Sequence, residues 1–472
     1  MRSLDEFLRR FGVPGCLSRM EFMLGQFFDS GGTLAVVVRV CRSGHRNLLR
    51  LPGPAGELRL AAANPGPLEH LRACVDYEGI AAEDRQRFNL VIHRFRSPSQ
   101  PLVEEQESWA AVTVDPGGPD YIGDVLTASS LVQLQEPPPA ERPTRTLGGN
   151  GAQSVRYVYS RSEWQGDNTP TDYDLIGARE AGTGLFALEQ VPWLDFICLL
   201  SGVPGAPLGP VALFAAERYC RERHALLIID PPANWTSVAD VSRTQHERGF
   251  SSPNALTYFP PLRSPPDLSD SGLLSAAGAI AGTLCAAGLA LPGRLPLSVG
   301  RARPPPDLDE MDEFPLSRLG VNAIMHTDQA RIELGGMVTL ARSGGVARSW
   351  NNLRERRIAL FILSSLAHYT RWAAFEAASE ELWRELRGQV GDFLAALHAR
   401  GLLAGDDSRE AFYVKCDTDT NGCNVAGSMR LVLIIGVALA RPGDFIAFRL
   451  EQGRRGCDAV ELGWQPGLAL AG

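Results

Sequence analysis

Residues 212–232 read ALFAAERYCRERHALLIIDPP, and this stretch decides the fold of the middle of the chain. It predicts a helix over Pro210–Arg223 that leads into a buried strand, Ala225–Asp230, which the two following prolines end. The preceding apolar run WLDFICLL, Trp193–Leu200, adds a strand before the helix. A strand, a helix and a strand in this order favour a parallel sheet with helices packed on its faces.

The N-terminal region predicts two short helices followed by strands. Ser-x-x-Glu spacings at residues 3–6 and 18–21 are typical of capping boxes that precede helices. The run TLAVVVRV at residues 33–40 is rich in valine and predicts a strand buried on both faces. Short alternating segments between Glu57 and Asp115 predict further β structure.

The C-terminal region predicts an α+β unit. Residues 350–369 form one candidate helix, and residues 379–401 form another, with a serine N-cap at its start and a glycine at its end. Apolar side chains recur on one face of the second helix. The segments 411–417 and 428–440 predict strands that complete the unit.

Composition narrows the class of protein. The chain has 472 residues, 44% of them hydrophobic and 21% charged, with a net charge of -8. These values indicate a globular protein of about three domains and argue against a dominant nucleic-acid-binding surface. Nine cysteines without a CxxC pair favour reduced thiols in the cytoplasm. The uncharged stretch 271–293 is rich in alanine, glycine and serine, which favours a buried helix, with a membrane helix as the alternative.

Motifs for cofactors and metals are incomplete. Residues 417–422 read DTDTNG, the first half of a calcium loop, but Ser428 stands where a bidentate carboxylate is required, so a polar turn is preferred to a calcium site. Gly149 and Gly151 follow a proline-rich segment instead of a strand, so a flexible linker is preferred to a dinucleotide loop. The histidines lie singly. No cofactor, no metal site and no catalytic residue are predicted.

Five segments follow one another toward the C-terminus: LSRLGVNAIM, WNNLRERRIALFILSSL, RWAAFEAASEELWRELRGQVGDFLAALHARGLL, AFYVKCDTDTNG and LVLIIGVALARPGDFIAFRLEQ. Their succession resembles the C-terminal domain of contractile tail sheath proteins, which surround the tails of contractile phages and related injection systems. Upstream, VPWLDFICLLSGVPG, AAERYCRERHALLIIDPP, NALTYFPPL and SAAGAIAG look like the subtilisin-like middle domain of that family. DEFLRRFG, FFDSGGTLAVVVRV and VTVDPGGPDYIGDVL look like its N-terminal region.

The resemblance implies an α/β and α+β multidomain fold. It comprises a subtilisin-like parallel-sheet middle domain and an α+β core domain built from the C-terminal region with the N-terminal segment. Proline-rich segments at 136–143, 260–267 and 301–313 separate the regions. The implied domains are an N-terminal segment packing with the C-terminal core (1–45), a β-rich region and linker (46–145), the subtilisin-like α/β domain (146–313), the C-terminal sheath domain (314–448) and a C-terminal arm (449–472).

The resemblance also implies a structural function without enzymatic activity. Sheath subunits polymerise around an inner tube and contract to drive it into a target. The expected partners are other sheath subunits, the inner tube protein and baseplate or cap components, without nucleic acid or membrane insertion. Assembly is expected in the cytoplasm, within a phage tail or a phage-tail-like particle that can be released. Since the sequence begins inside the helix that usually follows an N-terminal arm, a terminal-ring paralogue lacking that arm is one expectation, and a wrongly chosen start codon is the alternative.

Two sets of residues are candidates for contacts in such an assembly. Val460, Leu462 and Trp464 alternate and predict a strand that pairs with a neighbouring subunit, with a disordered tail as the alternative. Arg384 and Arg387 lie on the polar side of the predicted helix 379–401 and are candidates for contact with the inner tube. Solvated surface is the alternative for both arginines.

The rival hypothesis is an α/β hydrolase that uses the middle domain. Asp230 ends a strand, as the acid of a subtilisin-like site would, and Gly282 with Thr283 matches part of the serine motif. Leu284 then occupies the position of the nucleophilic serine, which argues against proteolysis. Cys285 would be the alternative nucleophile, and it would need a histidine within hydrogen-bond reach.

Overall fold

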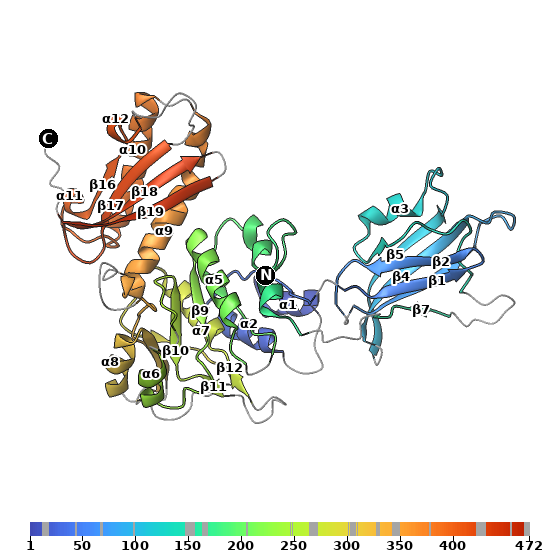
Figure 1. Cartoon of the computed structure of the whole chain (residues 1–472), viewed down its shortest axis with the longest axis horizontal. Coiled ribbons are helices and arrows are strands. Elements are labelled where there is room, and N and C mark those ends of the chain that lie inside the picture. Colours follow the sequence, from blue (N-terminus) through green and yellow to red (C-terminus); the bar gives the residue numbers. More distant parts are fainter. Residues whose placement is uncertain are drawn as a thin grey trace. The chain divides into compact units, whose positions relative to one another are not determined.

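The structure is a computed structural model. It describes residues 1–11, 18–42, 45–66, 69–97, 100–146, 156–162, 169–203, 206–245, 247, 249–263, 272–300, 302, 308, 310–326, 331–341, 350–376, 379–421, 431–453 and 456–466. The fold is a mixed α/β multidomain fold with several sheets (Figure 1). Two compact units are described separately: unit 1 comprises Met1–Val37 with Leu185–Gly472, and unit 2 comprises Val38–Gly184.

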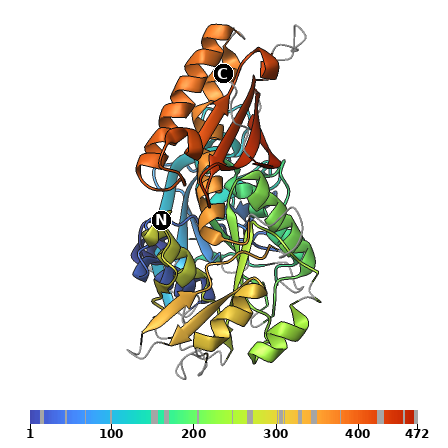
Figure 2. The same ribbon diagram turned by 90° about the vertical axis from the view of Figure 1, so that its left-hand side faces the viewer.

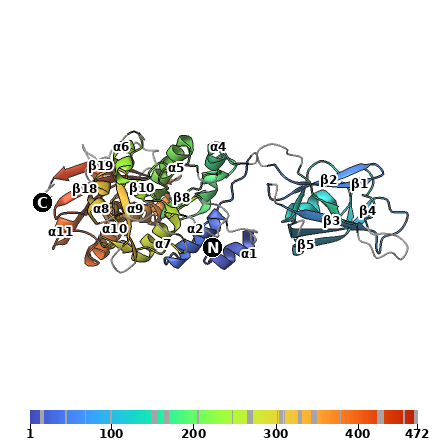
Figure 3. The same ribbon diagram turned by 90° about the horizontal axis from the view of Figure 1, so that it is seen from below.

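Unit 2 contains two antiparallel sheets, in the orders β1-β2-β6 and β5-β4-β3-β7 (Figures 1 and 3). One core holds side chains of both sheets, among them the fully buried Leu49, Leu60 and Leu90. The β structure predicted within 57–115 is confirmed. The elements are β1 (Leu48–Gly53), β2 (Gly56–Ala62), β3 (Leu71–Asp76), β4 (Arg87–Ser97), β5 (Gln100–Thr113), α3 (Ile122–Val125), η1 (Leu126–Ala128), β6 (Val132–Leu134), β7 (Val158–Tyr159) and α4 (Asp172–Ile176).

The proline-rich segment 136–143 is part of unit 2, and the chain around it is bonded to the strands of that unit. The Tyr77 hydroxyl donates to the Pro143 carbonyl at 2.6 Å, and the Thr146 amide donates to the Val75 carbonyl at 2.9 Å. Farther along the chain, β7 pairs with β3. The structure therefore divides the chain after Gly184 instead of after residue 145, because residues beyond the prolines complete a sheet of unit 2.

The central sheet of unit 1 has the order β13-β15-β14-β10-β9-β8. Strands β8, β9, β10 and β14 are parallel, so the predicted parallel sheet is confirmed. Strands β14 and β15 come from the region that the sequence assigned to the C-terminal domain, so the expected boundary at residues 313–314 does not separate two domains. The strands are β8 (Phe196–Cys198), β9 (Leu226–Ile229), β10 (Ala255–Phe259), β13 (Leu295–Pro296), β14 (Val321–His326) and β15 (Ile332–Gly335), beside a small pair, β11 (Leu262–Arg263) and β12 (Leu273–Leu274).

Helices cover both faces of this sheet. Tyr258 and Ile324 belong to the core that α2 and α7 share, whereas Phe259 and Ala323 belong to a second core shared with α6 and α8. Neighbouring residues of a strand thus reach opposite faces, as they do in a sheet that is buried on both sides. The helices are α1 (Leu4–Phe11), α2 (Arg19–Asp29), η2 (Gly184–Gln190), α5 (Pro210–Glu222), α6 (Val238–Thr244), α7 (Ala277–Ala287) and α8 (Glu310–Arg318).

The expected packing of the N-terminal segment with the C-terminal core domain stays a prediction; Met23 and Phe27 of α2 share one core with Ile324 and Leu360 from the region 314–448. Helix α2 itself packs on α7. The reason is a surface of small residues: a Cβ on Gly278 would lie 2.0 Å from the Met23 carbonyl oxygen, and a Cβ on Gly282 would lie 2.3 Å from the Phe27 carbonyl oxygen. Helix α7 is the small-residue helix predicted within 271–293, and its first eight residues are buried. Among the described helices, none has both the length and the apolar character needed to cross a membrane.

The prediction of a buried strand at residues 33–40 was wrong. Leu34 is 62% exposed and Val36 is 49% exposed, and the segment lies in no sheet. The backbones of Met1 and Ala35 exchange two hydrogen bonds, at 2.7 and 2.9 Å. Valine-rich sequences favour an extended backbone, but a strand also needs a neighbouring strand, and the described residues provide none for this segment.

The C-terminal part of unit 1 is an antiparallel sheet, β16-β17-β18-β19, with α9 and α10 beside it (Figure 2). Both predicted helices are confirmed, with Ser379 capping α10 and Gly401 at a φ of +71° after it. The two predicted strands are confirmed as β16 and β17. The elements are α9 (Leu353–Tyr369), η4 (Arg371–Phe375), α10 (Glu380–Ala399), α11 (Ser408–Ala411), β16 (Phe412–Lys415), α12 (Thr418–Asn421), β17 (Leu431–Ala438), β18 (Asp444–Gly453) and β19 (Gly456–Pro466).

Helix α9 belongs to two cores. Leu353 and Leu360 pack with the central sheet, whereas Ile358 and Ile362 pack with the C-terminal sheet. Arg356, on the same helix, is buried and donates to the Asn254 side-chain oxygen at 2.5 Å. One helix therefore joins the central sheet and the C-terminal sheet of unit 1.

Candidate functional site

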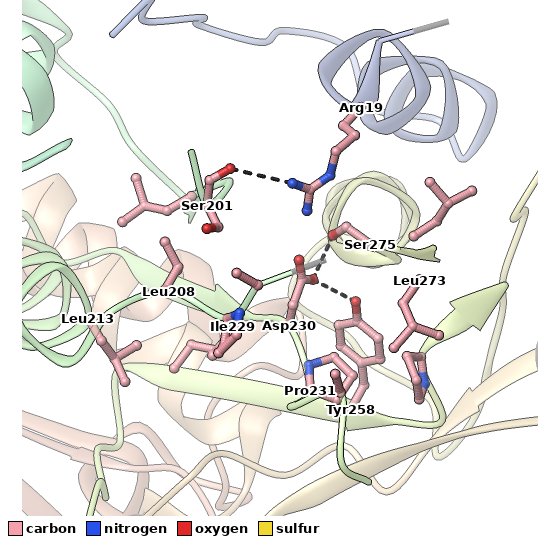
Figure 4. Close-up of a pocket in the computed structure, with 16 residues that line it drawn as sticks. Arg19, Ser201, Leu208, Leu213, Ile229, Asp230, Pro231, Tyr258, Leu273 and Ser275 are labelled. Atoms are coloured by element: carbon pink, nitrogen blue, oxygen red, sulfur yellow. Dashed lines mark hydrogen bonds between the residues drawn. The ribbon is translucent and has the colours of Figure 1, made fainter. Parts of the chain in front are cut away.

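A small cavity lies at the carboxyl ends of β8, β9 and β10, the position at which parallel α/β sheets bind ligands. Its volume is about 60 Å³. Asp230 follows β9, Tyr258 lies in β10, and Ser275 precedes α7; all three side chains converge in the cavity (Figure 4). Arg19, from the start of α2, points toward the same cavity and donates to the Ser201 carbonyl at 3.4 Å.

Asp230 is held by two hydroxyl groups. The Tyr258 and Ser275 hydroxyls each donate to Asp230 Oδ1 at 2.6 Å. The Tyr258 hydroxyl accepts from the Ala276 amide at 2.7 Å, and the Ser275 hydroxyl accepts from the Ala277 amide at 3.1 Å. Both hydroxyls thus link the carboxyl group to the start of α7, which gives Asp230 a structural role.

The surroundings of Asp230 make its ionisation harder than that of a free carboxyl group. Burial raises the pKa of Asp230, although its two hydroxyl partners and Arg19 oppose that shift. Burial and the neighbouring Asp230 raise the pKa of Tyr258 well above its ordinary value. A general base needs a pKa matched to its task and a proton to abstract, whereas these groups are engaged with one another and with backbone amides.

The described residues do not assemble a subtilisin-like catalytic triad. Leu284, at the position of the nucleophile, is fully buried, and Thr283 donates its hydroxyl to the Pro296 carbonyl at 3.2 Å. His224 follows the C-terminal end of α5, where burial and the nearby Arg356 and Arg223 lower its pKa to about 4. Among the described contacts, no histidine bonds to Asp230 or Ser275. Among the described residues, no base lies beside Asp230 and a leucine stands at the position of the nucleophile.

The alternative in which Cys285 is the nucleophile also lacks an activating base among the described residues. Burial and the nearby Asp195 raise the pKa of Cys285 to about 11, so its thiol stays protonated at neutral pH. Burial likewise raises the pKa of the neighbouring Cys198. Within the described part of the chain, no histidine contact to Cys285 is found. The geometry supports a structural role over the hydrolase alternative.

Asp230→Asn should make the protein more stable at neutral pH. Because burial raises the pKa of Asp230 in the folded state, the unfolded chain binds its proton more weakly, and folding loses stability as the pH rises above the ordinary carboxyl value. Asparagine does not ionise, and its oxygen can accept both hydroxyl bonds. We expect a higher unfolding temperature than wild type at pH 7, with the gain disappearing as the pH approaches 3.8. A lower unfolding temperature at pH 7 would show instead that the carboxylate stabilises the fold.

The DTDTNG segment is part of a local cap. Asp417 Oδ1 accepts from the Asp419 and Thr420 amides at 3.0 and 3.1 Å, at the start of α12. The structure thus has a one-turn helix where the sequence favoured a polar turn. No group of three potential metal ligands occurs among the described residues. Gly149, Gly151 and Ser428 lie outside the described residues.

The candidate assembly residues occupy two places in the C-terminal part. Val460 and Leu462 are exposed on β19, the edge strand of the sheet, and the backbone of Trp464 belongs to the same strand. Arg384 is exposed on α10, whereas Arg387 is half-buried and donates to the Cys416 carbonyl at 2.6 Å. The predicted arm 449–472 thus begins inside β18, and β19 pairs with its own chain.

Sequence reasoning missed a contact that fixes this edge strand. The Trp350 indole donates to the Glu461 carboxylate at 2.7 Å. The Arg356 guanidinium lies 4.6 Å from the centre of the Trp350 ring. No local pattern indicates this contact, because it joins residues 111 positions apart.

Comparison with known proteins places the fold. The sequence matches no protein-family model and no curated protein. Among solved structures, the sheath tail protein of Listeria innocua matches with a TM-score of 0.59 and 11% identity, over 96% of this chain and 91% of that chain. This chain has the fold of a sheath tail protein.

A second match to the sheath fold comes from Desulfitobacterium hafniense. Its sheath tail protein has a TM-score of 0.50 and 10% identity, over 95% of this chain and 88% of that chain. The sheath complex of an extracellular contractile injection system, in its contracted state, matches more weakly, with a TM-score of 0.42 and 19% identity over 56% of this chain and 73% of that chain. The resemblance read from the order of sequence segments is confirmed at the level of the fold.

Proposed function

We propose that this chain is a structural subunit of a contractile sheath, in a phage tail or a phage-derived injection system. The observation that carries the proposal is the sheath fold shared over 96% of the chain. The subunits would polymerise around an inner tube and contract to drive that tube into a target. The proposed partners are further sheath subunits, the inner tube protein and baseplate or cap components, in a particle assembled in the cytoplasm.

The middle of the chain supports a subtilisin-like architecture within this proposal. Its parallel strands β8, β9, β10 and β14 carry helices on both faces. Asp230 follows β9 at the carboxyl edge of the sheet, where a subtilisin-like acid would lie. The catalytic partners are replaced by residues of the core, which suits a scaffold better than an enzyme.

Electron microscopy tests the proposed function directly. The purified full-length chain, alone and co-expressed with its tube protein, should form rings or helical tubes of constant diameter, because head-to-tail contacts that do not close generate helices. A protein that stays monomeric under both conditions would contradict the proposal.

Edge strand β19 is the proposed link to the next subunit. An edge strand presents unpaired backbone groups to a neighbour, and here Val460 and Leu462 are exposed beside that edge. Arg384, exposed on α10, is the better candidate for the tube, because Arg387 already bonds to the Cys416 carbonyl.

Charged residues on β19 should block assembly without unfolding the subunit. We expect the double variant Val460→Lys and Leu462→Lys to form few or no tubes, since lysine on an edge strand discourages strand addition. Met311→Lys is the matched control, because Met311 is 83% exposed on α8. Tube length is counted in micrographs, and the unfolding temperature is measured alongside. Tubes of normal length from the double variant would remove β19 from the proposed contact.

A further inference from the structure

A row of side chains crosses the outward face of one sheet of unit 2. Tyr159 on β7 lies opposite Arg72 on β3, Arg72 lies opposite His93 on β4, and His93 lies opposite Gln106 on β5. The adjacent residues Ala73 and Ile92 point into the core, so the row lies on the other face. Three strand spacings give it a length of about 14 Å.

Hydrogen bonds and ring contacts order this row. Arg72 Nε donates to His93 Nδ1 at 3.2 Å, and His93 Nε2 lies 3.0 Å from Gln106 Oε1. His93 is therefore neutral, with its proton on Nε2. The Arg72 guanidinium lies 4.0 Å from the centre of the Tyr157 ring. These contacts hold a guanidinium, an imidazole and an amide in fixed positions beside tyrosine rings.

Arg72 differs from the neighbouring Arg94 in the carboxylate groups that surround it. Arg94, on β4, pairs with Glu69 and Glu105 at 2.8 Å each. For Arg72, the contacts found among the described residues are with His93, Tyr157 and Phe95, and none is with a carboxylate. The row thus presents an unneutralised positive charge next to Tyr159, whose side chain is 49% exposed.

We propose that this face of unit 2 binds an anionic saccharide. Tyr159 would stack on a sugar ring, Arg72 would pair with a carboxylate or sulfate, and Gln106 would bond to hydroxyls. An extended glycan fits a row of this length. An acidic peptide is the less favoured occupant, because peptides that add to sheets use the backbone of an edge strand, whereas this face offers side chains. The inference goes beyond the proposed sheath function and does not depend on it.

Binding of the full-length chain to immobilised heparin and to polygalacturonate tests the proposal, with dextran as the neutral probe. Arg72→Gln and Tyr159→Ala should each weaken binding about tenfold, the loss expected for one charge-assisted or stacking contact. The matched control is Arg50→Gln on β1, in the other sheet of the unit; Arg50 is exposed, and its variant should bind within about twofold of wild type. Unfolding temperatures verify that each variant is folded.

Three results would overturn the proposal. If Arg50→Gln weakens glycan binding as much as Arg72→Gln does, the glycan is attracted by the overall charge of the protein and not by this row. Dextran binding as strong as heparin binding would remove the anionic requirement. Polyglutamate binding that depends on Arg72 and Tyr159 and equals heparin binding would make an acidic peptide the occupant. Because tube formation is scored separately by microscopy, loss of glycan binding and failure of the sheath proposal can be told apart.

Discussion

Gly282→Ala should destabilise unit 1 by about 3 kcal/mol, at the upper end of the cost of overpacking a core. The new methyl group would lie 2.3 Å from the Phe27 carbonyl oxygen and 2.9 Å from the Ser30 Cβ. Backbone atoms cannot rotate away as a flexible side chain can, so α2 would have to move off α7. Thermal or denaturant unfolding measures the loss.

The matched control for this change is Gly391→Ala in α10. Both glycines lie inside helices, but a Cβ on Gly391 would meet nothing within 4 Å. Alanine should therefore stabilise α10 by about 0.5–1 kcal/mol through its higher helix propensity. The same substitution is therefore expected to lower the stability of the protein at position 282 and to raise it at position 391. If Gly282→Ala also stabilised the protein, the close packing of α2 on α7 would be refuted.

Phe448→Ala should cost about 3–5 kcal/mol, the usual range for a buried phenylalanine. Phe448 is 1% exposed in the core of the C-terminal sheet, and its ring centre lies 6.1 Å from that of Trp350. Calorimetry should show a lower unfolding temperature for unit 1, while the transition of unit 2, which has its own core, stays in place. Phe314→Ala provides the control, since Phe314 is 70% exposed and its removal should change stability by less than about 0.5 kcal/mol.

A variant in the core of unit 2 provides the opposite comparison to Phe448→Ala. Phe88 is fully buried in the core of unit 2, so Phe88→Ala should lower the transition of unit 2 and leave that of unit 1 unchanged. Equal shifts of both transitions by either variant would mean that the two units unfold as one.

Elements with strong local patterns could be predicted from the sequence. Helix α10 has a serine cap, a periodic apolar face and a glycine in the left-handed region at its end, and all three are in the structure. The strand before Asp230 is a short apolar run that prolines end, and it forms β9. In these cases, the information that decides the element lies within the element itself.

Pairing between distant segments could not be predicted in the same way. Residues 33–40 have the composition of a buried strand, but none of the described strands lies beside them, whereas β14 and β15 join the central sheet across the expected domain boundary. Of the candidate site, Asp230 was found because it ends a strand, while Tyr258 and Ser275 were missed because their contacts join residues 28 and 45 positions away. A polar residue just after a buried strand can be recognised from the local sequence. Its hydrogen-bond partners lie far along the chain, and the local sequence does not indicate them.

Helix α9 contributes side chains to the core shared with α2 and α7 and to the core of the C-terminal sheet, and this has a mechanical consequence. Its buried Arg356 bonds to Asn254 near the central sheet and lies over Trp350, whose indole is bonded to Glu461 on the edge strand. If a neighbouring subunit pulls on β19, the load passes along this continuous path to the parallel strands. The central sheet and the C-terminal sheet would then rotate together as one rigid body instead of bending relative to each other.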